Sequence, residues 1–346
     1  MKSTVIGIVV AGVVLGGGYL AYSKYTPQVR AVEVLDRVFS STSQRTTYTS
    51  KGTALLDITA PSKKGDTNDH AVVKYAVSGL VDKSVPDSFG KSSGRLDLDI
   101  NVEGSEGLVT KLAIDIAMDD KVFYLKLDLP AELLAGAPAF ISGLNNTWIK
   151  IDLNEFAKKG LITEEALATI SDTGKLDDPV TRGKLKEMVV KSGFFVDLSM
   201  VPGEDIDGLP TYKLTTSIDP LKLADIMIGY LEIVDPEALA KLTEEEKASL
   251  EEMEKRVAEF LKSSTISLVV EKDSALLRVV SGNVIFDDPE SKAAGAFDFT
   301  VEYNDINKPV NIELPKESTS IIDILAPFFG AFMPLAPAGR TGLPVK

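Results

Sequence analysis

Cysteine is absent from this chain, and histidine and tryptophan occur once each. Without cysteine there are no disulfides, no thiol nucleophile, no thiolate metal site and no lipidated cysteine. A single histidine, His70, excludes zinc sites built from several His or Cys ligands. His70 sits in a polar, turn-like stretch with Lys63–Asp69, which is a poor position for the base of a Ser-His-Asp triad. The residue types therefore predict neither a catalytic centre nor a cofactor.

Basic residues are in the minority: 37 Lys and Arg stand against 51 Asp and Glu, a formal net charge of −14. Nucleic acids and anionic lipid surfaces select clustered Lys and Arg, so the balance argues against both as electrostatic partners. A solvated acidic surface that aids solubility is expected instead. Two acidic clusters fit this interpretation, Asp97/Asp99 on the wet face of a strand and Glu204/Asp205/Asp207 in a hairpin turn without calcium-loop spacing.

One long uncharged run lies near the N-terminus. Thr4–Tyr22 has 19 residues without a charge, which as a helix of ~1.5 Å per residue would span a bilayer. Ala21-Tyr22-Ser23 also fits a cleavage site, but the run is longer than a typical secretory core, which favours an uncleaved anchor. Lys2 predicts that the short end is cytoplasmic. We expect residues 1–26 to be a transmembrane signal anchor of a single-pass cell-membrane protein, with the folded part extracytoplasmic (periplasmic or at the cell surface).

Apolar and polar residues alternate through much of 48–153, with clear examples at 96–103, 111–118, 121–130 and 148–153. Alternation with period two predicts strands that have one apolar and one wet face, as in antiparallel sheets. Turn residues between the strands predict a meander. The apolar face of such a sheet requires a cover from elsewhere in the chain.

Helices are predicted at 27–39 and then after residue 152. Asp-Pro pairs place an N-cap and a first helical proline at three positions, and Thr243 with Glu246 forms a capping box. The helix after Asp219 is apolar on most sides, so we expect it to be deeply buried. Further strands are predicted between and after the helices: 194–201, 211–218, 266–270, 275–286, 296–304 and 310–314.

These elements predict an α+β fold: a single large, curved antiparallel sheet, or half-barrel, whose concave face is covered by helices from 157–262. The N-terminal transmembrane helix precedes it. No Pro/Ser-rich linker divides the chain, so one domain is expected from 27 to 333. A Pro/Gly-rich tail, 334–346, is expected to be disordered.

Four segments of the chain resemble the LolA-like superfamily, which includes lipoprotein carriers and the LppX/LprG-type lipid-carrier lipoproteins. They are Lys121–Asp128 (KVFYLKLD), Thr147–Leu153 (TWIKIDL), Leu209–Ala224 and Tyr303–Pro315. The resemblance covers about 27–316 and implies a half-barrel closed by helices around a hydrophobic cavity that carries lipid or acylated cargo outside the cytoplasm. This chain lacks the lipidated cysteine and has a spanning segment instead, which argues against shuttling between membranes.

The leading hypothesis is a non-enzymatic, membrane-anchored module that binds a lipid, an acylated molecule or another apolar ligand and hands it on. The alternative is a structural or sensory ectodomain with a filled core that acts through a protein partner. The candidate cavity residues are apolar and share one face of the predicted sheet or lie on the apolar helix: Leu98, Ile100, Ile114, Ile116, Phe123, Leu125, Leu127, Ile149, Ile151, Ile226, Met227, Tyr230 and Leu231.

The predicted strands 121–129 and 148–153 carry charges on their wet faces. If the two strands pair antiparallel, Lys126 is expected to face Asp152, and Asp128 to face Lys150. Exposed ion pairs of this kind stabilise a folded protein by only ~0.2–1 kcal/mol each. They would therefore favour one register of the two strands without holding the fold together.

Overall fold

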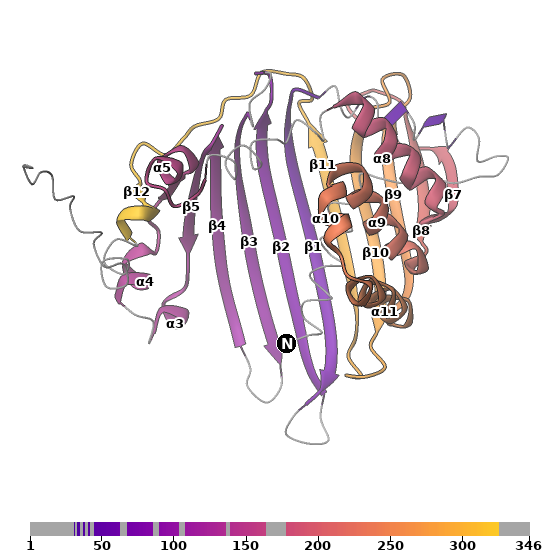
Figure 1. Ribbon diagram of the computed structural model, residues 1–346, viewed down its shortest axis with the longest axis horizontal. Helices are drawn as coiled ribbons and strands as arrows, with labels where there is room; N and C mark the ends of the chain where they lie inside the picture. The colour runs from indigo at the N-terminus through magenta and orange to yellow at the C-terminus, as the bar shows by residue number, and fades with distance from the viewer. Residues whose placement is uncertain are drawn as a thin grey trace, which may run out of the picture.

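A computed structural model describes residues 45–62, 68–85, 90–103, 108–135, 139–163 and 178–324, and a few helical positions between Ala31 and Ser41. In this part of the chain twelve strands form one sheet, in the order β12-β6-β5-β4-β3-β2-β1-β11-β10-β9-β8-β7 (Figure 1). Neighbouring strands are antiparallel except for β12 and β6, which are parallel. The prediction of a large, mostly antiparallel sheet is confirmed.

Both terminal segments that the sequence singles out, 1–26 and 334–346, lie outside the described residues. Within the described ranges no helix is both long and apolar enough to cross a membrane. The helix expected at 27–39 is described only at single positions, and helical structure extends to Ser41. There the Ser41 hydroxyl donates to the carbonyl of Ala275, 2.7 Å away, which ties this helix to the turn between β9 and β10.

The first half of the sheet is the predicted meander. Direct partners in an antiparallel pair lie on the same face, and Leu98 lies opposite both Tyr75 and Leu112. This places the apolar residues on one face, here called the apolar face, and most of the charged residues on the other, the polar face. The strands are β1 (Thr47–Pro61), β2 (Asn68–Asp82), β3 (Lys91–Glu103), β4 (Leu108–Asp119), β5 (Val122–Asp128) and β6 (Ile149–Asp152).

The predicted register between β5 and β6 is wrong, although the two strands do pair antiparallel. Tyr124 lies opposite Lys150, so Lys126 does not face Asp152. Lys126 instead forms an ion pair with Asp115 of β4, 2.8 Å away, and its Nζ lies 5.2 Å from the centroid of the Trp148 ring. The observed register differs from the predicted one by four residues, since Val122 takes the place opposite Asp152. Alternation with period two is the same after any even shift, so the pattern cannot choose between these registers.

The second half of the sheet joins the first through β11, where Phe299 lies opposite Ala54 of β1. The strand expected at 310–314 is not formed. Pro309 and Pro315 bracket this stretch, and proline offers no N–H to a ladder. Thr319–Ser320 (β12) pairs with β6 in its place. The other strands are β7 (Phe195–Pro202), β8 (Thr211–Ile218), β9 (Leu261–Glu271), β10 (Leu277–Asp287) and β11 (Ala294–Asn304).

Helices begin where the caps predict. Asp178 accepts a hydrogen bond from the N–H of Thr181, Asp219 accepts one from Leu221, and Thr243 forms the capping box with Glu246. A group of helices lies over the β9–β11 side of the sheet (Figure 1): α8 (Pro179–Ser192), α9 (Leu223–Val234), α10 (Pro236–Lys241) and α11 (Glu244–Phe260). Three short helices flank β5 and β6: α3 (Ala131–Leu134), α4 (Ala139–Leu144) and α5 (Leu153–Lys158).

Among the described residues, the helices complete a filled core over one half of the apolar face only. Leu214 of β8 and Val284 of β10 are 1% and 2% exposed and pack with Val257 of α11. Over the first half, Val77 and Ile116 remain 42% and 48% exposed. The predicted helical cover from 157–262 is therefore correct for the second half of the sheet and wrong for the first.

The expectation that the apolar helix α9 is deeply buried is wrong as well. Only Leu223 and Ala224 are buried in it, and Tyr230 is 37% exposed. The helix lies in an outer layer on one side of the sheet, so one of its faces meets solvent despite its apolar composition. Composition alone does not show how many layers will cover a helix.

Asp152 ends β6 and begins α5. Its carboxylate accepts hydrogen bonds from the N–H groups of Asn154 and Glu155, at 3.1 and 3.2 Å, and pairs with Lys150 at 3.1 Å. Burial raises the pKa of this carboxyl, but the hydrogen bonds from Lys150 and from the backbone outweigh burial and hold the pKa below its usual value. The ionised form is therefore favoured in the folded protein.

We expect Asp152→Ala to lower the free energy of unfolding at pH 7 by about 1 kcal/mol, since a helix cap is lost. A lowered native pKa stabilises the fold above the unfolded pKa, and this contribution disappears as the pH falls through the native pKa. The difference in the free energy of unfolding between the variant and the wild type should therefore shrink below about pH 4. Urea unfolding across this range measures it, with exposed Asp287→Ala as the control. A loss of stability that is the same at every pH would contradict the conclusion that the folded protein lowers the pKa of Asp152.

Candidate functional site

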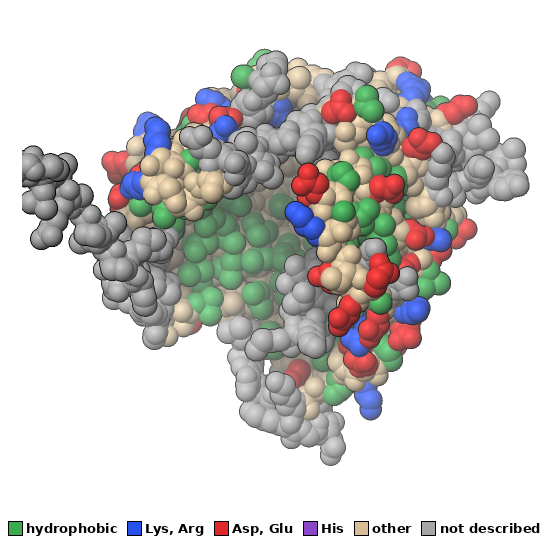
Figure 2. Space-filling view, viewed as in Figure 1, with side chains coloured by type: hydrophobic (Ala, Val, Ile, Leu, Met, Phe, Trp, Pro, Cys, Tyr) green, Lys and Arg blue, Asp and Glu red, His purple; other side chains and the backbone are tan. Residues whose placement is uncertain are grey.

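The uncovered half of the apolar face is the candidate site. Figure 2 shows a hollow lined by hydrophobic side chains between the helices over the second half of the sheet and the short helices beside β5 and β6. By the register of the strands, its floor is the apolar face of β2 to β6. We call this surface the open apolar face.

The residues of the open apolar face lie in rows that cross the strands. In one row Val77, Leu96, Ile114 and Leu127 lie side by side. From the row of Ile58 to the row of Tyr48, no residue with a charged side chain occupies this face in β1 to β5. The surface offers dispersion contacts to an apolar molecule and no charge to bind an ion.

Two glycines leave positions without side chains on the open apolar face, in the same row as Ile116. Gly79 of β2 and Gly94 of β3 lie in the same row as Ile116 and Leu125. Because glycine has no side chain, nothing projects from the sheet at these positions of β2 and β3, whereas the Ile116 side chain projects from β4. The row continues to Ile149 of β6, which is 6% exposed.

The structure brings the predicted sheet residues together. All of them lie on the apolar face in adjacent rows: Leu98, Ile100, Ile114, Ile116, Phe123, Leu125, Leu127, Ile149 and Ile151. Sequence reasoning left out Val77 and Leu96, although both lie in alternating stretches and share rows with the predicted set. Occupancy of this surface by a ligand remains a prediction.

The candidate residues on the helix α9 do not line the open apolar face together with the sheet residues. Ile226 and Met227 of α9 pack against the filled core of the second half. Leu231 is partly buried, and Tyr230 is more exposed than either core-packed residue. The structure therefore gives Ile226 and Met227 a packing role in the covered half of the sheet.

Two partly buried tyrosines lie on the apolar face. Burial raises the pKa of Tyr75, and burial also raises the pKa of Tyr48, against an opposing effect from the nearby Arg45. Both phenols therefore stay neutral well above neutral pH. The face carries hydroxyl groups at these points but no ionised group.

The polar face carries its charges in pairs. Arg95 pairs with Asp97 at 2.9 Å and with Asp115 at 3.1 Å, and Lys111 pairs with Asp99 at 2.9 Å. The interpretation of Asp97 and Asp99 as the wet face of a strand is thus confirmed. In the described part of the chain, no three His, Cys, Asp or Glu side chains are grouped to hold a metal ion.

His70 does not lie in a turn, as the sequence suggested, but on β2. Its Nε2 lies 2.8 Å from the Asp57 carboxylate of β1, and its Nδ1 lies 3.9 Å from Glu103 of β3. β2 begins at Asn68, because the hairpin with β1 continues further than the polar composition predicts. Both neighbours of the ring are carboxylates, so the arrangement is an exposed hydrogen-bonded cluster on the polar face.

No family model and no curated protein matches the chain significantly. Similar solved structures include the Mycobacterium tuberculosis lipoprotein LppX, which is 12% identical, with 84% of this chain and 100% of that chain covered and a TM-score of 0.28. A DUF1329 family protein from Desulfovibrio piger is 11% identical, with 79% and 92% covered and a TM-score of 0.15. These scores are too low to carry an argument, so function is argued from the site.

Proposed function

We propose that the open apolar face binds the acyl chain of a lipid or of an acylated molecule, in a non-enzymatic role. The observation that carries the proposal is the exposure of Ile116 and Val77, 48% and 42%, within rows that hold no charge. Contiguous exposed apolar surface of this kind usually marks a binding site. The resemblance to lipid carriers in the sequence agrees with this interpretation.

An acyl chain suits this surface better than a folded partner does. The face is a hollow, and the glycine pair Gly79 and Gly94 leaves its floor without side chains in one row. A flexible chain can follow such a floor, whereas a protein partner would need to insert an apolar element of matching shape. The uncharged rows also provide nothing for a charged partner to pair with.

Location follows as part of the same proposal. Residues 1–26 would anchor the domain at the outer surface of the cell membrane, where lipids and acylated molecules are at hand. A fixed anchor favours transfer to a neighbouring molecule over diffusion between membranes.

Leu125→Trp tests the proposal, since Leu125 lies between Ile116 and Ile149 in the row that contains the glycine pair. We expect the wild-type protein to take up a fluorescent fatty-acyl probe saturably. The variant should bind it at least about tenfold more weakly, because the indole fills the space of the chain. The melting temperature should change little, since an open face has room for the larger ring.

Val109→Trp is the matched control, because Val109 lies on the polar face of β4 and is 72% exposed. It should bind the probe as the wild type does. Absence of saturable uptake by the wild type, or equal uptake by Leu125→Trp, would refute the proposal. A lipid-free protein with a strongly destabilised Leu125→Trp variant would support the structural or sensory ectodomain instead.

A further inference from the structure

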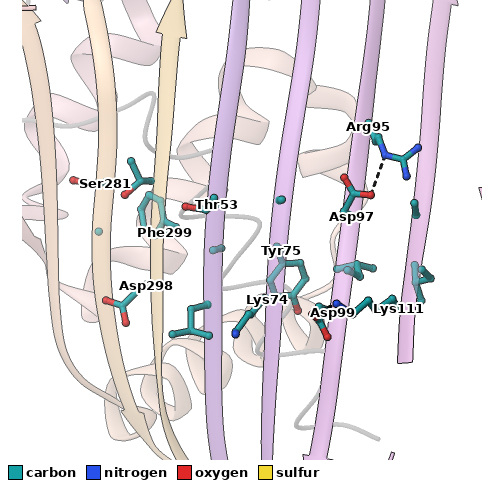
Figure 3. A pocket seen from close by; sticks show the side chains of 18 of the residues that line it. Thr53, Lys74, Tyr75, Arg95, Asp97, Asp99, Lys111, Ser281, Asp298 and Phe299 are labelled. Carbon is teal, nitrogen blue, oxygen red and sulfur yellow. Dashed lines mark hydrogen bonds and ion pairs between the residues drawn. The ribbon is translucent and has the colours of Figure 1, made fainter. Parts of the chain in front are cut away.

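A groove crosses the polar face, on the side of the sheet away from the helices. It has a volume of about 1060 Å³ and, in the order of the sheet, runs across the strands from β5 to β9, with Lys74, Thr53 and Ser281 among its lining residues (Figure 3). A twisted sheet is saddle-shaped, so each face is concave along one direction. The groove is thus separated from the open apolar face by the thickness of the sheet.

Hydroxyl side chains form a continuous row across the strands in and beside this groove. From β7 to β1 each strand contributes one residue, and each residue is the direct partner of the next: Ser199, Thr215, Ser267, Ser281, Thr300 and Thr53. We call this the hydroxyl row. Neighbouring strands are ~4.8 Å apart, so the hydroxyl groups repeat at that interval.

Most hydroxyl groups of the row that line the groove make no hydrogen bond to another described residue. Ser267, Ser281, Thr300 and Thr53 line the groove. Among these, the Ser267 hydroxyl approaches the Thr215 hydroxyl at 3.5 Å, whereas the hydroxyl groups of Thr53, Ser281 and Thr300 have no hydrogen-bond partner among the residues that the structure describes. Each hydroxyl can donate one hydrogen bond and accept others, so the row offers both functions to a ligand.

The charges that line the groove nearly balance, with Lys74, Arg95 and Lys111 against Asp97, Asp99, Asp128 and Asp298. Arg95 pairs with Asp97 and Lys111 pairs with Asp99, both at 2.9 Å. At the other end the Asp298 carboxylate accepts from the Asn283 amide at 2.7 Å. A groove with paired charges has little preference for phosphate groups, nucleic acid or metal ions, which select unbalanced charge.

Small apolar surfaces lie between the polar groups. Leu55 and Ala76 line the groove beside Thr53, and Ala113 lines it on β4. Alternating hydroxyl groups and small C–H surfaces match the chemistry of a sugar ring, which has polar edges and an apolar face. They match neither an acyl chain, which offers no hydrogen bond, nor a highly charged polymer.

We propose that this groove binds a neutral oligosaccharide, laid across the strands along the hydroxyl row. Sugar hydroxyls donate to and accept from Thr53, Thr300 and Ser281, while Lys74 and Asp298 bind hydroxyls at the groove margins. The site lies on the opposite face from the acyl-chain site and does not depend on it. The same chain would then hold a lipid on one face and a glycan on the other.

Calorimetric titration of the full chain with maltohexaose, cellohexaose and chitohexaose tests the proposal. We expect saturable binding of at least one of them, weakened at least about tenfold in the Thr53→Val/Thr300→Val double variant. Valine is β-branched and close to threonine in shape, so the strands should pair as before while two hydroxyls are lost. Ser281→Ala removes a third hydroxyl and serves if the double variant does not fold.

Two controls separate this site from other effects. Thr59→Val removes a hydroxyl from the same face of β1 at a position outside the groove, opposite His70, and should bind as the wild type does. Leu125→Trp should also retain saccharide binding while it loses the acyl probe. The proposal fails if the wild type binds none of the three saccharides, if the hydroxyl variants bind them with unchanged affinity, or if either control loses binding as well.

Discussion

Leu214→Ala is expected to lower the free energy of unfolding by about 3–5 kcal/mol, whereas Ile116→Ala should cost about 1 kcal/mol or less. Both residues lie on the apolar face of the same sheet. Leu214 is 1% exposed in the filled core, so its truncation leaves a cavity. Ile116 is 48% exposed, so its truncation removes few contacts.

Urea unfolding of both variants beside the wild type measures the contrast. The comparison is matched, because each change shortens a branched aliphatic side chain on a strand that pairs with a neighbour on both sides. Equal and large losses would show that the first half of the apolar face is as well packed as the second. The open apolar face, and with it the proposed acyl-chain site, would then have to be given up.

Ile116→Glu is expected to reduce uptake of the fatty-acyl probe by at least about tenfold, with little change in stability. A bound acyl chain would cover the new carboxylate, and burying an unpaired charge is costly. In the ligand-free protein the position is 48% exposed, so the carboxylate stays hydrated and the fold is retained.

Val109→Glu on the polar face of the same strand is the control, since Val109 is 72% exposed and lies away from the hollow. Val77→Glu provides a second test on β2, at a position 42% exposed. Both open-face variants should lose probe uptake, and the control should keep it. Uptake that survives both Ile116→Glu and Val77→Glu would show that the acyl chain binds elsewhere, and the proposed site would be wrong.

The main features of the fold could be predicted from local patterns. Alternation in stretches such as 96–103 depends only on which side chains a strand turns toward water, so the strands and faces of the meander are predicted correctly. Capping residues such as Asp178 and Thr243 act on the backbone within one turn, so the helix starts were also correct. The sheet part of the candidate site followed from the same alternation.

The errors came from features that depend on distant parts of the chain. The predicted register of β5 and β6 is wrong by four residues, because alternation with period two is unchanged by any even shift. The prediction that α9 is deeply buried is wrong, because Tyr230 faces solvent at the outer surface of the helical layer. His70 was assigned to a turn because its neighbours are polar, but pairing with β1 continues through it.

The sequence by itself determined that the chain forms a large sheet with an apolar and a polar face, because alternation and capping are local. Only the tertiary structure decided that the helices cover one half of that sheet, which leaves Ile116 and Val77 exposed. It also decided the hydroxyl row, since Thr53 and Thr300 become neighbours only when β1 pairs with β11. Strand register and helix placement are set by contacts between residues far apart in the chain, and no local pattern contains them.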